Sequence, residues 1–164
     1  MKLDKLDLAI LVALEADARL SFAALAEIVG ISKTPCWKRV QALEAAGAIR
    51  GYRAVVAPKT IGLGVQALVQ VMIDFAKRAE FEAGVLADPA ILECHTTAGE
   101  ADYILKIASQ DVDDLDTLLR MRLSLLPGVQ RSTTLIFLKA VKEDGALTLA
   151  RGGSRPQGFS GRTS

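Results

Sequence analysis

One glycine between two apolar-patterned segments constrains the fold of this chain more than any other feature. Residues 22–46 read FAALAEIVGISKTPCWKRVQALEAA, and Gly30 separates two stretches with helical spacing of apolar residues. In the first stretch, Leu25, Ile28 and Val29 are expected to face inward. A glycine just after a helix can adopt positive φ without steric cost. The stretch therefore predicts two short helices joined by a tight turn, the layout of a helix-turn-helix.

The helix after this turn has two faces of different character. Cys36, Val40 and Leu43 are spaced by four and three residues, so they share one face and are expected to pack inward. Either Ser32 or Thr34 is expected to cap this helix. The residues expected on the outer face and its flank are Lys33, Thr34, Trp37, Lys38 and Gln41.

Positive charge is concentrated around this helix, although the net charge of the chain is only +1. Residues 31–53 contain five Lys or Arg residues and a single acid, Glu44. A solvated helix face can be basic, but such an excess also suits a phosphate backbone. The sequence therefore predicts binding to double-stranded DNA through Ser32, Lys33, Thr34, Trp37, Lys38, Gln41, Arg50 and Arg53.

Three features near the predicted interface have two interpretations each. Arg39 can reach a phosphate or pair with an acid inside the domain. Trp37 can contact a sugar or a thymine methyl group, or it can support a helix crossing. Residues 48–56 can form a plain strand tip, or a two-stranded wing that places Arg50 and Arg53 beside the DNA backbone. The wing is favoured because three predicted helices precede it.

An amphipathic helix is predicted over residues 1–18, before the helix-turn-helix. Leu3, Leu6, Ile10 and Leu14 recur at three- and four-residue spacing. Asp4 is expected to cap this helix. Together these helices make residues 1–54 a DNA-binding domain, a winged helix-turn-helix.

A second domain is predicted after a linker at residues 55–64, which contains Pro58, Gly62 and Gly64. Apolar and polar residues alternate over residues 65–75, as in a strand. The pattern that follows predicts a ferredoxin-like βαββαβ domain over residues 65–143 and an α+β fold overall. The predicted elements span 65–75, 79–87, 91–97, 103–108, 111–126 and 129–142.

Two helices on one face of a four-stranded sheet leave the other face open, so a homodimer is expected. After this domain, residues 144–164 are rich in Gly, Ser and Pro and are expected to be a disordered tail. Loose contact of the tail with DNA is an alternative to a passive role.

Several classes of protein do not fit the sequence. Two cysteines and one histidine do not supply a convincing zinc site, and no cofactor is expected. Cys94 and His95 are strand neighbours and point to opposite faces, so they are poorly placed as a nucleophile and its base; an enzyme is not expected. No apolar run approaches the ~20 residues of a membrane span. Without a signal-peptide pattern, the thiols indicate a reducing cytoplasm.

The sequence resembles the Lrp/AsnC (feast/famine) transcriptional regulators of bacteria and archaea. The matching motifs, in chain order, are Leu3-Asp4, Asp7, Ile10-Leu11, the run VGISKTPC at 29–36, Lys38-Arg39-Val40, Leu43-Glu44, Gly47, Ile49, Gly51-Tyr52, Glu93-Cys94-His95, Gly99, Asp102-Tyr103 and the run LPGV at 126–129. Together they cover about residues 3–142.

The resemblance implies a dimer that often assembles to an octamer, and an amino-acid effector held between subunits near the turn at 99–102. It implies that Thr97, Gly99, Glu100, Ala101, Asp102 and Thr134 border that site. Backbone N–H groups near Gly99 would bind the carboxylate of an amino acid, and Glu100 or Asp102 would bind its ammonium. The alternative is an ordinary turn in which Gly99 has positive φ and Asp102 caps the backbone.

These observations predict a sequence-specific DNA-binding transcriptional regulator whose assembly or DNA affinity responds to a small effector. The alternative function is an amino-acid-sensing oligomer without specific DNA binding.

Overall fold

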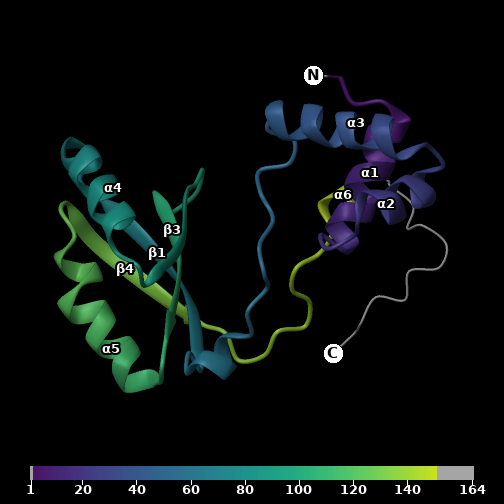
Figure 1. Cartoon of the computed structure of the whole chain (residues 1–164). Helices are drawn as coiled ribbons and strands as arrows, with labels where there is room; N and C mark the ends of the chain where they lie inside the picture. Colours follow the sequence, from purple (N-terminus) through teal and green to yellow (C-terminus); the bar gives the residue numbers. More distant parts are fainter. Residues whose placement is uncertain (1, 151–164) are drawn as a thin grey trace. The chain divides into compact units, whose positions relative to one another are not determined.

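The computed structural model describes residues 2–150, which form two compact units (Figure 1). The first unit contains residues 2–54 and 142–150, and the second is Val55–Val141. The chain therefore leaves the first unit once and returns to it. Within residues 2–150, no helix combines the length and apolar character needed to cross a membrane.

Three helices build the first unit: α1 (Lys5–Ala16), α2 (Phe22–Val29) and α3 (Lys33–Ala45). The expected cap of the first helix is confirmed. Asp4 Oδ1 accepts hydrogen bonds from the backbone N–H groups of Leu6 and Asp7, and the Asp4 N–H donates to Asp7 Oδ2. This reciprocal pair is a capping box, which satisfies N–H groups that the first helical turn leaves without partners.

The turn at Gly30 is confirmed as the junction between α2 and α3. Gly30 has φ of 72° and donates to the carbonyls of Ala26 and Glu27, while Ile31 N–H donates to Ala26 at 3.0 Å. These bonds use carbonyls at the end of α2 that lack helical partners. Ser32 occupies the N-cap position of α3, but its side chain makes no capping hydrogen bond.

The core of the first unit confirms the inner face predicted for α3. One residue of α2 differs from the prediction: Ile28 is 38% exposed. It lies about 200° around the helix from the buried Ala26, at ~100° per residue, so both cannot face the core. The buried cluster consists of Ile10, Ala13, Leu25, Ala26, Cys36, Val40 and Leu43.

The two-stranded wing predicted over residues 48–56 is wrong, because the structure has no strand there. Val55 and Val56 are β-branched, which favours strands, but they are 80% and 54% exposed and belong to no ladder among the described residues. A strand needs a neighbouring backbone to pair with. The segment is held to α3 by other contacts: the N–H groups of Ala48 and Ile49 donate to the carbonyl of Leu43, and the Tyr52 hydroxyl donates to Glu44 Oε1 at 2.8 Å.

The second unit contains a four-stranded antiparallel sheet with strand order β2-β3-β1-β4, which confirms the predicted βαββαβ arrangement. A short 3-10 helix, Pro58–Ile61, lies within the predicted linker. The main elements are β1 (Val65–Ile73), α4 (Arg78–Ala87), β2 (Ile91–Thr96), β3 (Tyr103–Ser109), α5 (Val112–Met121) and β4 (Val129–Ile136). Shorter 3-10 helices span Phe75–Lys77 and Leu123–Leu125.

Helices α4 and α5 cover the same face of the sheet (Figure 1). The core lies between them and the sheet, where the rings of Phe81 and Tyr103 pack with centroids 4.8 Å apart and planes tilted by 52°. The opposite face carries Leu68, Met72 and Leu135, and Met72 and Leu135 are exposed. Within this unit the sheet is therefore covered on one side only.

Two elements end earlier than predicted. Helix α5 ends at Met121 and continues as the 3-10 turn Leu123–Leu125 instead of reaching residue 126. Strand β4 ends at Ile136 instead of 142, because its neighbour β1 begins at Val65. The last ladder bond joins Phe137 N–H to the carbonyl of Gln66.

Part of the predicted disordered tail is ordered. Residues Leu147–Ala150 form the short helix α6, so disorder over residues 144–164 is wrong for this part. The reason is a contact distant in sequence, in which the carboxylate of Glu15 accepts hydrogen bonds from Leu147 and Thr148. The remainder of the predicted tail, residues 151–164, lies outside the described residues.

Candidate nucleic-acid interface and effector loop

Helix α3 presents a polar, basic face to solvent. Lys33, Thr34, Lys38 and Gln41 are exposed, whereas Cys36, Val40 and Leu43 on the opposite face are buried. Ser32 is also exposed, at the start of the helix. Trp37 is 42% exposed, so one part of its ring is free to meet a ligand while the remainder is covered.

Arg39 pairs with two acids of the first helix, which answers one open question from the sequence. Its Nη1 lies 2.7 Å from Asp4 Oδ2 and 2.7 Å from Asp7 Oδ1. Hydrogen bonds from the backbone N–H of Asp7 and from the guanidinium of Arg39 hold the pKa of Asp4 below its usual value. Arg39 therefore connects α3 to α1. The signal in the sequence was the pair of acids, Asp4 and Asp7, three residues apart at the start of a helix.

Arg50 and Arg53 lie on the irregular segment that follows α3, and both are exposed. Between them, burial together with the hydrogen bond and charge of Glu44 raises the pKa of Tyr52 to about 12. The two arginines also border a groove of about 690 Å³, which Leu3 and three residues of α1, Leu8, Leu11 and Leu14, line as well. Both arginines therefore follow the basic helix α3 in the chain and are open to solvent.

The loop between β2 and β3, residues 97–102, is closed by its own hydrogen bonds. Thr97 N–H donates to the carbonyl of Asp102 at 2.9 Å, and the Thr97 hydroxyl donates to the carbonyl of Ala101. Asp102 ties the loop to the end of β1, since its N–H donates to Val71 and its Oδ2 accepts from Ile73 N–H at 2.9 Å. Ala101 is buried beneath the loop.

The outer part of this loop is open. Gly99 and Glu100 are both exposed. Gly99 does not have the positive φ that the alternative of an ordinary turn requires, so that part of the alternative is wrong. A Cβ added at Gly99 would meet no atom within 4 Å. The backbone-capping role considered for Asp102 is confirmed by its bond to Ile73.

The structure brings residues 97–102 together but places Thr134 elsewhere. Thr134 lies on β4 opposite Val69 of β1, so β1 and β3 separate it from the β2 edge of the sheet. Opposed residues in an antiparallel ladder share a face, and Val69 is buried against the helices, so Thr134 points to the helix side.

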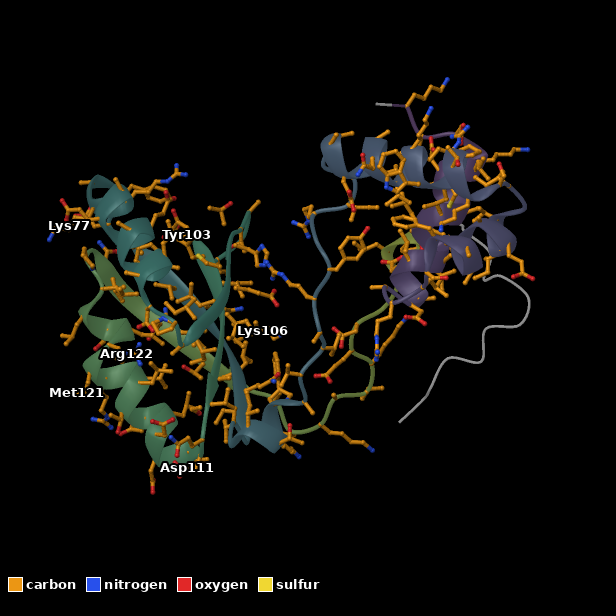
Figure 2. The ribbon with its side chains drawn as sticks, viewed as in Figure 1. Lys77, Tyr103, Lys106, Asp111, Met121 and Arg122 are labelled. Atoms are coloured by element: carbon orange, nitrogen blue, oxygen red, sulfur yellow. The ribbon has the colours of Figure 1, made fainter. Side chains whose placement is uncertain are left out.

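His95 and Cys94 have separate environments, as their strand positions predicted. Cys94 packs against the helix-side core, and burial raises the pKa of its thiol. His95 Nε2 lies 3.3 Å from Glu93 Oε2, and Lys106 Nζ lies 3.3 Å from Glu93 Oε1. Lys106 is on the side of the sheet away from the helices (Figure 2). Across residues 2–150, no group of three or more His, Cys, Asp or Glu side chains could hold a metal.

Family comparisons agree with both candidate regions. Residues 3–44 match the AsnC-type helix-turn-helix domain, and residues 66–147 match the Lrp/AsnC ligand binding domain. This chain belongs to the Lrp/AsnC family. As an Lrp/AsnC protein it is a transcriptional regulator, with a helix-turn-helix domain that binds DNA and a second domain that binds a ligand.

Curated relatives of this Lrp/AsnC regulator are similar over most of their length. The proline dehydrogenase transcriptional activator of Rhizobium radiobacter is 38% identical over 146 residues, which cover 87% of this chain and 94% of the relative. The leucine-responsive regulatory protein of Haemophilus influenzae is 35% identical over 150 residues, 90% of each chain.

Solved structures show the same fold. A transcriptional regulator from Neisseria meningitidis, in complex with L-Met, has a TM-score of 0.87 and 34% identity, covering 92% of this chain and 99% of that one. The AsnC protein of E. coli has a TM-score of 0.81 and 28% identity, covering 87% of this chain and 97% of that one.

Proposed function

We propose that α3 is the reading helix of this regulator and binds in the major groove of double-stranded DNA. The supporting observation is its exposed face, where Lys33, Thr34, Lys38 and Gln41 lie opposite a fully buried apolar stripe. An amide such as that of Gln41 can bind adenine through two hydrogen bonds, and a lysine can bind guanine. Lys38 and Gln41, three residues apart, therefore occupy neighbouring positions on one face and would read neighbouring bases.

The remaining candidates would hold the DNA backbone. Ser32 and Lys33 lie at the start of α3, where a hydroxyl, an ammonium and free N–H groups favour a phosphate. Arg50 and Arg53 would bind phosphates beside the groove, and the exposed part of the Trp37 ring would contact a sugar or a thymine methyl group. Arg39 is left out because it is held by Asp4 and Asp7.

A salt titration tests the DNA proposal. Fluorescence anisotropy with DNA from upstream of this gene should give an affinity that falls linearly, on logarithmic axes, as salt rises. A slope near zero would contradict the phosphate assignments. Absence of sequence preference would favour the alternative function, an amino-acid-sensing oligomer without specific DNA binding.

We infer that the effector is an amino acid bound at the loop of residues 97–102, and the L-Met complex of the Neisseria meningitidis relative supports this class of ligand. The exposed backbone at Gly99 would bind the carboxylate. Glu100 is the better partner for the ammonium, because Asp102 already accepts from Ile73 N–H. Thr97 and Ala101 would shape the loop, and Thr134 is left out of the site because it lies on the helix side of β4, away from the open face of the sheet.

Thermal unfolding with each of the twenty amino acids tests the effector proposal, because a ligand selective for the folded state raises its stability. One or a few amino acids should raise the melting temperature. If none does, the amino-acid proposal is wrong and the DNA proposal is unaffected.

The open face of the sheet supports a two-fold homodimer. Leu68 and Leu135 pair on that face, and Met72 lies beyond the Gln70–Thr133 pair; a self-complementary contact would remove these apolar side chains from water. Dimers would assemble further to an octamer and act on DNA in the cytoplasm. Two reading helices related by a two-fold axis imply pseudo-palindromic sites. Light scattering at micromolar concentration would test the assembly, and a monomer would contradict it.

Control would be allosteric. An effector that binds one assembly state or dimer geometry better than another shifts the population toward that state. The shift changes how the reading helices are spaced on DNA. The coupling is reciprocal, so specific DNA should change the effector affinity by the same factor.

A further inference from the structure

The end of the described chain returns to the DNA-binding unit and is held there by one side chain. Residues 142–150 belong to the same compact unit as α1, α2 and α3. Glu15, in the last turn of α1, accepts hydrogen bonds from Leu147 N–H at 2.7 Å and Thr148 N–H at 2.9 Å. The Thr148 hydroxyl donates to the same carboxylate. One carboxylate therefore binds three donors from two consecutive residues.

The bound form favours the ionised carboxylate. Burial alone would raise the pKa of Glu15, but the hydrogen bonds from Thr148 and Leu147 outweigh it and lower the pKa. An ionised carboxylate accepts hydrogen bonds more strongly than a neutral amide does. Substitution by glutamine would therefore weaken this contact while preserving the shape of the side chain.

The contact is polar and shallow. Leu147 borders the groove beside Leu11 and Leu14 but remains 75% exposed, and the groove keeps a volume of about 690 Å³. Leu149 of α6 is half-buried, so one apolar side chain adds to the Glu15 hydrogen bonds. A contact of this small size belongs to the parts of a protein that open readily.

The position of the segment in the chain gives the contact a role. Strand β4 of the ligand-binding unit ends at Ile136, and only residues 137–146 separate it from α6. The linker after α3 is the other connection between the units. When α6 is docked, the DNA-binding unit is attached to the ligand-binding unit through both its ends; when α6 is released, only the linker remains.

We propose that Glu15 is a docking site for the chain's own residues 147–148, and that this reversible contact ties the end of β4 to the DNA-binding unit and restrains it. The docking follows from the contacts above, whereas its consequence for DNA rests on the proposed function. Once one reading unit has bound its half-site, a restrained second unit has a higher effective concentration at the other half-site than a unit attached by a single linker.

Hydrogen exchange in the full chain tests the docking. Exchange at the amides of Leu147 and Thr148 should be at least about fivefold faster in Glu15→Gln than in the wild type, because the opened state is more populated. Thr148→Val, which removes only the hydroxyl donor, should accelerate the Leu147 amide by a smaller factor. Glu27→Gln is the matched control, since it removes one charge from an exposed position on α2. Equal rates in the wild type, Glu15→Gln and Thr148→Val would overturn the proposal.

A DNA measurement tests the consequence. Duplexes with one or two copies of a half-site, selected in vitro with this protein, separate single contacts from paired ones. Glu15→Gln should weaken binding to the double site by about three- to tenfold and leave the single site unchanged. Equal loss on both duplexes, or no loss on either, would overturn the restraint. If the selection yielded no DNA that the wild type binds, the proposed function would fail, while the exchange result would still decide the docking.

Discussion

Arg39 of α3 donates to Asp7 of α1 across 2.7 Å, and Asp7 is mostly buried. The same guanidinium binds Asp4, which caps the helix that carries Asp7. One arginine therefore fixes the position of α3 relative to the start of α1. Its side chain has the same charge as those proposed to bind DNA, but its role is internal.

Replacing Arg39 by methionine should lower both stability and specific DNA binding. The change keeps most of the side-chain length and leaves Asp7 without its ion pair, so the melting temperature of the first unit should fall. Specific binding should weaken more than non-specific binding, because α3 loses its fixed orientation. Calorimetry and anisotropy would measure the two effects. Lys, which can still pair with Asp7, should restore part of each; unchanged stability in Arg39→Met would show that the pair contributes nothing.

Acid should weaken the first unit through Asp4. Its pKa is lowered in the folded state, so its stabilising effect is complete above the unfolded value near 3.8 and is lost as the pH falls through the lower folded value. Thermal unfolding from pH 6 to pH 2 should therefore be steeper below about pH 4 in the wild type than in Asp4→Asn, which still caps the helix. Asp113→Asn, at an exposed position on α5, serves as the control. Parallel curves for all three proteins would be inconsistent with the assignment.

Replacing Lys38 by alanine should weaken DNA binding without changing the fold. If Lys38 binds a phosphate, the slope of log affinity against log salt should become less steep by about 1; if it binds a base, the preference at one base pair should relax at a cost of about 1–3 kcal/mol. Circular dichroism should match the wild type, since Lys38 is exposed. Lys59→Ala, in the 3-10 helix of the second unit, should leave the affinity within twofold. Unfolding of Lys38→Ala would disprove the face assignment.

Two glycines of the second unit should respond to alanine in opposite ways. Gly128 has φ of 81°, and a Cβ there would lie 2.9 Å from the Cβ of Lys77, so Gly128→Ala should destabilise by about 1 kcal/mol or more. Gly99 has free space around it, so Gly99→Ala should keep its stability in urea unfolding but weaken the thermal response to the effector. A large loss of stability in Gly99→Ala would mean that this glycine serves the loop itself.

The sequence predicted best what depends on near neighbours. The Asp4 cap, the turn at Gly30 and the buried face of Cys36, Val40 and Leu43 all follow from spacings within one or two helical turns. The βαββαβ order followed from alternation within each segment. Its strand ends did not, because the end of β4 depends on where β1 begins.

Contacts between distant residues were the ones that sequence patterns missed. The partner of Arg39 is 32 residues away in Asp7, so spacing alone left two interpretations open. The wing failed because β-branched residues indicate a preference for strands but supply no partner backbone. Residues 147–150 were predicted as part of a tail because composition describes only neighbouring residues, whereas their helix depends on a contact with the distant Glu15.

The separation of Glu15 from Thr148 has a consequence for biosynthesis. The two residues are 133 positions apart, so at roughly 5–20 residues per second the ribosome makes Thr148 about 7–27 seconds after Glu15. The helices that read DNA emerge first and fold without α6. The ligand-binding unit is then translated in full before the chain returns to them. A protein truncated after the second unit would keep the helices proposed to read DNA but would lack the contact between α6 and Glu15.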